Sequence, residues 1–496
     1  MASKGSLKST LAVSLNNYLD AGAIVAGGSG ITLWQRYLDL TEMHLGWINA
    51  LSANALGAAI GAIVGGFLAD KFGRKFIFTY NLLVYMLGVL IVMLSVNFPM
   101  LLVGFLITGI SVGIGVPASW TYISESSEVN NRGRNICISQ MSWGFGPMII
   151  LLMGMLLAPG GYLFDLVKSV ASLFTETAGY DIVSSALAAL QGAGVEVAKL
   201  ATLDEIMAKM TECNIPYEKE AFSAAYSVYL SVNAFSSRVV FFTLFVVAFI
   251  AWLLQRQLEE SAEFKASKEA AKEKGEKGGL LKSFSVLFSN KVAVKSALFL
   301  AAIYLTWNLV ASVMGFFSPH ICETAGGVSN EYSNMMNCAQ WATVVGVTFC
   351  VSHVVDKMSH KVLYILGLVF ALATWVLVVS GGVNSMLGLW AFVILWGLNG
   401  GISVQIFYAL WGSELFPAKF RAGAQGLMFF VVRGLSAAWG LAFTGIYGEN
   451  GEGFTIAAYC MIALLVISLV VGVLGCPNTR GKSLDQIVKE RYGDNY

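Results

Sequence analysis

The chain has 496 residues, of which 56% are hydrophobic and only 12% are charged, and its formal net charge at pH 7 is +1. Soluble domains carry about 25% charged residues, so this chain has too little charge to cover a water-facing surface, and its mean hydropathy of +0.69 indicates a membrane protein. The small net charge and the lack of any nucleic-acid-binding motif argue against a nucleic-acid partner.

The first segment of the chain is too polar for a cleavable signal peptide. Asn16, Asn17 and Asp20 stand where the apolar core of such a peptide would be. The cysteines and histidines show no metal-ligand spacing, so we expect neither a metal ion nor a cofactor. A disulfide bond between Cys322 and Cys338 stays open, because both would lie near the outer face.

Twelve mostly apolar runs are each long enough to cross a bilayer, which takes about 20 helical residues. They form two groups of six, so we expect an all-α membrane protein with twelve transmembrane helices in two six-helix bundles. In chain order the runs are 11–34, 43–70, 76–97, 99–124, 135–159, 234–256, 293–317, 336–356, 362–382, 387–413, 422–446 and 454–476.

Two polar stretches interrupt this pattern. The first separates the fifth and sixth runs, and charged residues break up its amphipathic piece AGVEVAKLATLDEIMAKM, so we expect an extracellular helical insertion. The second is rich in Ala, Glu and Lys and predicts a partly helical cytoplasmic linker. The expected order is helices 1–5 in 1–159, the insertion in 160–232, helix 6 in 233–256, the linker in 257–292, the second bundle in 293–476 and a cytoplasmic tail in 477–496.

Basic residues predict the orientation, because Lys and Arg concentrate in cytoplasmic connections. They gather in one set of connections, in the linker and in the tail, whereas the short loops on the other side, such as those around Asn97 and Val383, carry none. We therefore expect a multi-pass protein of a cell membrane with both termini in the cytoplasm.

One connection occurs twice. GGFLADKFGRK (Gly65–Lys75) follows the second run and VSHVVDKMSHK (Val351–Lys361) follows the eighth, and both place Asp-Lys shortly before further basic residues. The repetition indicates two related six-helix units.

The first copy of this connection has the composition of a cytoplasmic latch. Gly66 allows two helices to approach closely and Gly73 permits a tight turn. Asp70 stands beside Arg74 and Lys75, with which it can form a charged contact that breaks when the two halves move. The alternative is that the basic residues only anchor the loop on the cytoplasmic side.

GFLADKFGRK resembles the loop signature of the major facilitator superfamily. Four more segments resemble its sugar-porter branch: PASWTYISESSEVNNRGR after helix four, RQLEESAEF after helix six, SELFPAKFRAGAQG between helices ten and eleven, and PNTRGKSLDQI after helix twelve. NNYLDAGAIVAGGSGITLW resembles, more narrowly, the bacterial inositol-transporter-like subgroup. The resemblance covers the chain except the 160–232 insertion, and it implies the major facilitator fold and transport by alternating access.

Matching connections of the two halves carry further charged residues. We expect these residues to form charge networks that stabilise the outward-open state without contacting the substrate. They are Glu125, Arg132 and Arg134 in the first half, and Asp356, Glu414 and Arg421 in the second.

Asp20 lies in the middle of the first run, where a carboxylate is costly and is a functional candidate by default. The resemblance implies proton coupling, because proton-coupled sugar porters carry a carboxylate here; the alternative is a structural acid paired with a helix end or an amide. The arginine that the family commonly has in helix four is replaced by Phe105, and residues 101–122 contain no basic side chain. Sodium coupling or facilitated diffusion therefore stays open.

Gln140 and Trp143 share one face of the fifth run, and an amide beside an aromatic ring suits a polyol. Sugar porters have a substrate-facing glutamine at the position of Gln140; the alternative for this amide is an interhelical hydrogen bond. Other candidates are polar or aromatic residues near the middle of helices one, seven and ten, where packing is the alternative role: Asn17, Trp307, Asn308, Asn399, Gln405, Tyr408 and Trp411.

Arg433 lies well inside the eleventh run and needs a counter-ion, backbone carbonyls or an anionic substrate.

The resemblance and the candidate residues together predict a secondary active transporter of a sugar or a cyclic polyol such as myo-inositol. We expect it to work by proton symport, as a monomer among membrane lipids. A symporter of organic acids that uses Arg433 is the first alternative, and a sugar sensor that does not transport is the second. No set of residues typical of a membrane enzyme occurs.

Overall fold

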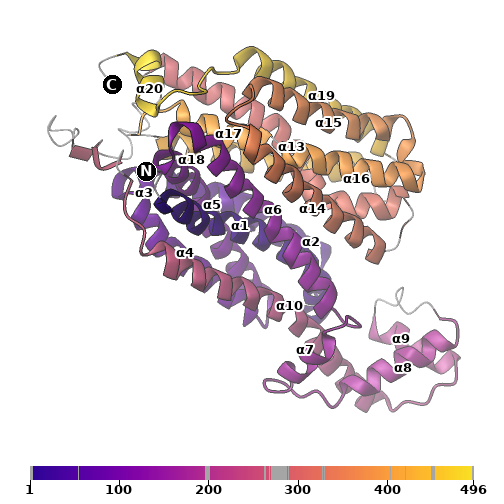
Figure 1. The fold of residues 1–496 in the computed structure, drawn as a ribbon. Coiled ribbons are helices and arrows are strands. Elements are labelled where there is room, and N and C mark those ends of the chain that lie inside the picture. The colour runs from indigo at the N-terminus through magenta and orange to yellow at the C-terminus, as the bar shows by residue number, and fades with distance from the viewer. Residues whose placement is uncertain are drawn as a thin grey trace.

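The computed structural model describes residues 4–53, 55–195, 202–261, 264–266, 268–269, 288, 290–326, 328, 330–402, 404–418, 421–447 and 453–493. These residues form helices and connections, and no strand occurs within these ranges. Nine helices of the described part are long and apolar enough to cross a membrane, so the chain is a multi-pass α-helical membrane protein (Figure 1).

The first bundle begins at α1 and ends at α10, which lies beyond the insertion. A short 3-10 turn, η1 (Val129–Asn131), precedes α6. The bundle consists of α1 (Lys4–Leu38), α2 (Glu42–Leu51), α3 (Leu56–Phe72), α4 (Arg74–Met93), α5 (Phe98–Ser126), α6 (Arg132–Leu157) and α10 (Lys219–Gln255).

The second bundle is followed by a short helix, α20, that packs on its end. The 3-10 turn η3 (Gly382–Asn384) joins the third and fourth segments of this bundle. Its helices are α13 (Lys291–Gly326), α14 (Asn330–Val354), α15 (His360–Val379), α16 (Met386–Gly401), α17 (Val404–Glu414), α18 (Arg421–Tyr447), α19 (Phe454–Gly475) and α20 (Leu484–Tyr492).

Two of the expected spans each contain two helices in the part of the chain that the structure describes. The 43–70 run forms α2 and α3, separated by the turn at Ser52, and the 387–413 run forms α16 and α17, separated at Ile402. The helices α1, α3 and α14 are not among the nine apolar ones: α3 has only 17 residues, and α1 and α14 contain many polar side chains.

The two bundles pack in the same way, as the repeated connection predicts. In the first bundle α1 contacts α6 and α10, α5 contacts α3 and α4, and α4 contacts α10. In the second, α13 contacts α18 and α19, α16 contacts α14 and α15, and α15 contacts α19. Each helix pair of the first bundle thus has its counterpart in the second, and the two bundles meet through α3 against α18 and α6 against α14.

Glycines bring α3 and α18 together between the bundles. A Cβ atom at Gly66 would collide with the backbone of Ala422, and one at Gly426 would collide with the backbone of Ala62. Small residues of this kind let membrane helices approach until their backbones touch. The contact is therefore close, and it leaves no space for lipid or solute at this end of the molecule.

The insertion between α6 and α10 is a small helical unit with its own core. It contains α7 (Phe164–Ala171), α8 (Tyr180–Gly192) and α9 (Leu203–Glu212), and the range expected for it also includes the first part of α10, from Lys219 onward. The 37 residues of α10 span about 55 Å at about 1.5 Å per residue, which exceeds the roughly 30 Å of a bilayer core. Its first turns project beyond the other helices and carry the insertion (Figure 1).

The expected linker lies mostly outside the described residues, since 262–263, 267, 270–287 and 289 are among those left undescribed. All seven cysteines are described, and no disulfide bond joins Cys322 to Cys338.

We predict that Leu190→Ala destabilises the insertion and leaves the membrane bundles intact. Leu190 is fully buried in the small core with Val183 and Met210, and the loss of a buried leucine side chain costs about 2–5 kcal/mol. Limited proteolysis should cut the variant faster between 160 and 217 only. Leu187→Ala, at a half-buried neighbour, is the milder control, and equal cleavage rates for wild type and Leu190→Ala would contradict the prediction.

Candidate functional site

A cavity of about 120 Å³ lies between the two bundles. Helices from both bundles line it, and amides and indoles are prominent among small and aliphatic side chains. The amides and the one charged group are Gln140, Asn308, Gln340, Asn399, Gln405 and Arg433, and the indoles are Trp143, Trp307, Trp341 and Trp396.

Hydrogen bonds hold several of these side chains in place. Gln405 Nε2 donates to Gln140 Oε1 at 3.1 Å, and this bond joins α17 of the second bundle to α6 of the first. Trp307 Nε1 donates to Asn399 Oδ1 at 3.3 Å, and Asn308 Nδ2 donates to Ser436 Oγ at 2.8 Å.

Other polar atoms of the same residues have no hydrogen-bond partner within the described part of the protein. These atoms are Gln140 Nε2, Asn399 Nδ2 and Gln340 Oε1, two donors and one acceptor, all buried. A buried polar group without a partner is costly. The cavity therefore favours a ligand that can both accept and donate hydrogen bonds, and the flat indoles offer apolar surface for its C–H groups.

Three residues that line the cavity were not predicted from the sequence. Gln340 and Trp341 lie on α14, and Trp396 lies on α16. Gln340 and Trp341 are the same residue types as Gln140 and Trp143, but they are adjacent and lack the spacing of three, so a search by helix face would not have paired them.

Three residues expected to contact substrate lie elsewhere. Asn17 donates from Nδ2 to the backbone and hydroxyl oxygens of Ser139, at 3.0 and 2.8 Å, which ties α1 to α6. Tyr408 stacks on Tyr304 with ring centroids 4.1 Å apart. Neither of these residues lines the cavity.

Trp411, the third, is fully buried inside the second bundle. It packs against the rings of Phe407 and Phe299, with centroids 5.3 and 5.9 Å away. Gln405, on the same helix, lines the cavity, so α17 presents one side to the cavity and the side of Trp411 to the interior of the second bundle.

Asp20 lies beside the cavity, next to the lining residues Ala21 and Ile24. It is 3% exposed, and its Oδ2 atom has no hydrogen-bond partner within the described residues. The guanidinium of Arg433, on α18 of the other bundle, attracts its charge. The opposing charge thus comes from the second bundle.

The position of the family's helix-four arginine is filled by an aromatic packing residue. The ring of Phe105 on α5 meets the ring of Phe241 on α10 edge to face, with centroids 5.8 Å apart. This contact lies within the first bundle, so Phe105 contributes packing and no charge near Asp20.

Arg433 belongs both to the cavity and to the surroundings of Asp20. It is 5% exposed and lines the cavity, and its guanidinium lies over the ring of Phe429, 4.9 Å from the centroid. A cation held over an aromatic face is partly stabilised there.

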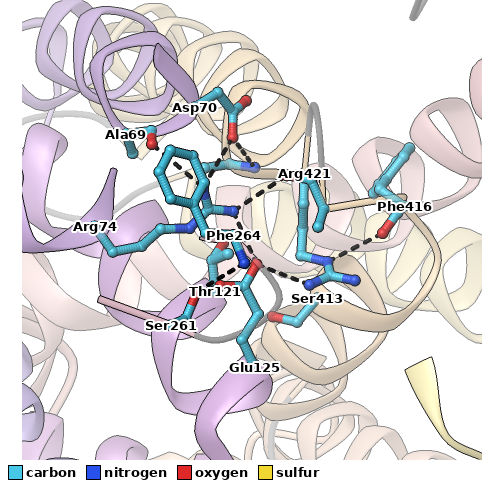
Figure 2. A network of polar contacts seen from close by, with 12 residues as sticks. Ala69, Asp70, Arg74, Thr121, Glu125, Ser261, Phe264, Ser413, Phe416 and Arg421 are labelled. Atoms are coloured by element: carbon cyan, nitrogen blue, oxygen red, sulfur yellow. Dashed lines mark hydrogen bonds and ion pairs between the residues drawn. The ribbon is translucent and has the colours of Figure 1, made fainter. Parts of the chain in front are cut away.

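A cluster of buried charges joins the bundles at the end where the two termini lie; we call this end the latch face. Glu125 of α5 accepts from Arg74 Nη2 and from Arg421 Nη1, both at 2.8 Å, and all three side chains are at most 1% exposed. Ser261 Oγ donates to the other carboxylate oxygen of Glu125 at 2.6 Å. Figure 2 shows the two guanidinium groups converging on this one carboxylate.

Asp70 adds a second contact at the latch face. Its carboxylate accepts from the backbone N–H groups of Ala422 and Gly423, at the start of α18. Asp70 also lies 3.7 Å from Arg74. An acid at a helix N-terminus is favoured by the free N–H groups and by the helix dipole.

The matching connection of the second half contributes the mirror arrangement. Asp356, just beyond α14, accepts from the backbone N–H groups of Gly133 and Arg134 at the start of α6, both at 2.8 Å. Burial raises the pKa of Asp356 above the ordinary value of a carboxyl group, against the lowering effect of these hydrogen bonds and of nearby arginines. Arg132 Nη1 pairs with Glu414 at 2.9 Å.

The backbone of Gly73, Arg74 and Lys75 also contributes to the latch sequence. Gly73 has a φ of +100°, which favours glycine. Glu260 accepts from the N–H groups of Arg74 and Lys75, both at 3.1 Å. The structure therefore brings together the predicted gating residues, and it represents the state in which the latch face is closed.

The family model of the Major Facilitator Superfamily matches residues 11–180 and 221–441. The minor myo-inositol transporter IolF of Bacillus subtilis (strain 168) is 35% identical over 502 residues, covering 98% of this chain and 94% of that protein. The arabinose-proton symporter of Escherichia coli (strain K12) is 31% identical over 134 residues, 27% of each chain.

Solved structures share the fold. The proton:xylose symporter XylE bound to 6-bromo-6-deoxy-D-glucose superposes with a TM-score of 0.69 at 15% identity, over 99% of this chain and 100% of that one. A variant of the fucose:proton symporter FucP of E. coli gives a TM-score of 0.61 at 14% identity, over 94% of this chain and 99% of that one.

We predict that Glu125→Gln opens the latch face. Without the carboxylate charge, two buried guanidinium groups remain close together, and breaking a buried ion pair from one side costs about 3–5 kcal/mol. Only the closed state bears this cost. We therefore expect a longer distance between two nitroxide spin labels attached at the exposed positions Lys71 and Met358, as measured by electron paramagnetic resonance.

The matched control is Glu128→Gln. Glu128 is an exposed carboxylate of the same connection, at 3.3 Å from Asn131. Its variant should keep the wild-type distance distribution, and the same distribution in Glu125→Gln would refute the role assigned to Glu125.

Proposed function

The chain belongs to the major facilitator superfamily, and we propose that it carries a cyclic polyol such as myo-inositol, or a monosaccharide, by proton symport. It is a transporter and not a sugar sensor, as its relatives and its fold indicate. The proposal concerns the solute, the coupling ion and the residues that handle each of them.

The observation that carries the proposal is the composition of the central cavity. Buried amides with unused hydrogen-bonding atoms alternate there with indole rings. A sugar or polyol has hydroxyl groups around its edge and C–H groups on its faces, so it can satisfy the amides and pack on the rings. The whole-length relative named for myo-inositol supports this class of solute.

We assign proton coupling to Asp20 and, opposite it, Arg433. Asp20 is buried beside the cavity, and relatives named as proton symporters support the coupling ion. A carboxylate and a guanidinium on different bundles attract each other most strongly when the acid is ionised and the bundles are close. A proton on Asp20 weakens this attraction, which links protonation to the relative motion of the bundles.

The proposed cycle is alternating access. The closed latch face supports a state in which the solute enters from the opposite end, and the ion pairs of Glu125 must break before the solute leaves through the latch face. The basic connections favour a cytoplasmic latch face, with both termini in the cytoplasm of a cell (inner) membrane. We propose that the protein works as a monomer in the lipid.

One observation favours a second candidate, an organic-acid symporter. Arg433 is the charged side chain that lines the cavity, and a guanidinium binds carboxylates well. In this alternative the anion of the solute, and not Asp20, would meet Arg433 during transport.

The proposal predicts uptake of radiolabelled myo-inositol into proteoliposomes, driven by an inward proton gradient. With one proton per solute, a gradient of about one pH unit supports about tenfold accumulation, since one unit corresponds to about 1.4 kcal/mol. Asp20→Asn should lose accumulation and keep exchange of labelled for unlabelled solute. An absence of both accumulation and exchange in the wild type, under any gradient, would rule out myo-inositol.

Gln140→Ala should weaken solute binding about tenfold, as expected for the loss of one or two hydrogen bonds in a buried site. The measurement is the solute concentration that half-saturates exchange. Tyr408→Phe is the control, because Tyr408 lies away from the cavity and its hydroxyl makes only a long bond, 3.4 Å, to the Gln425 carbonyl. An unchanged value for Gln140→Ala would remove Gln140 from the binding site.

Arg433→Gln distinguishes the two candidates. If Arg433 serves as the counter-charge of Asp20, the variant loses proton-driven accumulation of myo-inositol but retains exchange, and Arg433→Lys restores part of the accumulation. If Arg433 binds an anionic solute, exchange of myo-inositol is absent in the wild type, and Arg433→Gln abolishes the uptake of organic acids.

A further inference from the structure

The insertion carries an exposed apolar surface at its first helix, and we propose that this surface lies in the head-group region of the bilayer. The surface consists of Tyr162, Leu166, Leu173 and Phe174, and we call it the α7 apolar surface. Their exposed fractions are 90%, 58%, 77% and 76%, which is unusual for side chains of this size.

Tyr162 lies two residues before the start of α7, and Leu166 lies on the outer side of α7. Its inner side is buried through Phe164, Val167 and Ala171. Hydrogen bonds from Leu173 N to Val170 O and from Phe174 N to Ala171 O continue the helical path beyond Ala171. Leu173 therefore follows Leu166 by seven residues on the same side of the helix, and Phe174 comes next along this path.

A contact of the Phe174 ring shows at which level along α10 the α7 apolar surface lies. It stacks on Phe235 of α10, with ring centroids 5.9 Å apart and 25° between the planes. Phe235 lies one turn of α10 before Arg238. The α7 apolar surface is thus near the level of Arg238, at the end of the bundle where α6 ends and the insertion begins (Figure 1).

Arg238 marks the edge of the bilayer. Its guanidinium lies over the rings of Trp34 and Tyr37, 5.3 and 5.5 Å from their centroids, and donates to the carbonyl of Ser95 at 3.1 Å. Ser95 stands in the short connection between α4 and α5. Arginine, tryptophan and tyrosine concentrate where the hydrocarbon meets the head groups, so this cluster places the interface at the level of Phe174.

The surface also continues the lipid-facing side of α10. Phe242, Val246 and Phe249 follow Phe235 by 7, 11 and 14 residues, which puts all four on one side of the helix, and the three are 50%, 39% and 44% exposed. Phe174 covers the end of this apolar stripe. The occupant that fits both the stripe and the α7 apolar surface is one continuous lipid leaflet.

The rest of the insertion has the opposite character. Its outer residues on α8 and α9 include the side chains of Asp181 and Glu212, which are 74% and 66% exposed and face water. Interfacial helices combine an apolar side in the head groups with a polar side in this way. Because α7 packs on α6 and α10, the anchor attaches the insertion to the first bundle and leaves the second bundle free to move.

The test measures which quencher reaches a fluorophore at single positions in lipid nanodiscs. Leu166→Cys and Leu173→Cys are labelled with an environment-sensitive dye in the full chain, in which the exposed native Cys350 is replaced by serine. Ile182→Cys is the matched control, because Ile182 is an apolar residue of α8 with a similar exposed fraction, 55%. The two quenchers are aqueous iodide and a phospholipid with a nitroxide close to its head group.

We expect the labels at 166 and 173 to be quenched severalfold more by the nitroxide lipid, and severalfold less by iodide, than the label at 182. Equal iodide quenching at 173 and 182 would overturn the proposal. Protection of 173 from both quenchers would also overturn it, since another protein surface would then cover this side of α7. Neither readout depends on the transported solute, so the proposal stands or fails separately from the proposed function.

Discussion

The carboxylate of Glu125 is the group on which the closed structure depends. It is shared by Arg74, from its own bundle, and Arg421, from the other bundle, and all three are withdrawn from water. An isolated ion in such a place would be strongly destabilising, and mutual attraction offsets this cost only while the bundles stay together. The same interaction that stabilises the closed latch face therefore makes its opening a discrete step, because separating the bundles must rehydrate charges that are paired in the closed state.

The closed latch face determines what kind of cavity remains between the bundles. Glycine contacts bring α3 and α18 together at this end, while the cavity remains between the bundles near their middle. The hydrogen bond between Gln405 and Gln140 crosses from one bundle to the other at the cavity. Each bundle presents amides to the other, and their unused donors and acceptors are suited to a solute rich in hydroxyl groups. The closed latch face and the cavity thus occupy the same interface at two different depths.

Asp20 and Arg433, to which we assign proton coupling, differ from the set of residues common in the family. In the family to which the chain belongs, an arginine on helix four commonly accompanies the acid of helix one, and here Phe105 occupies its place. The charge that acts on Asp20 instead comes from α18, in the other bundle. A partner on a different rigid body moves relative to the acid during the cycle, whereas a partner in the same bundle does not. This difference gives the pair a direct connection to the motion of the bundles.

The sequence by itself determined the membrane class, the two related halves and the family, and it predicted the gating residues around Gly65–Lys75, because apolar run length, basic loops and repeated connections are local properties. Only the tertiary structure decided which polar residues face the cavity. Tyr408 and Trp411 lie in an aromatic core of the second bundle, and the packing of α14 against α6 brings Gln340 and Trp341 to the cavity. The partner of Asp20 lies more than four hundred residues away in the chain. No local pattern can specify such a pair, since helical periodicity defines the faces of one helix and the packing of several helices decides which faces meet.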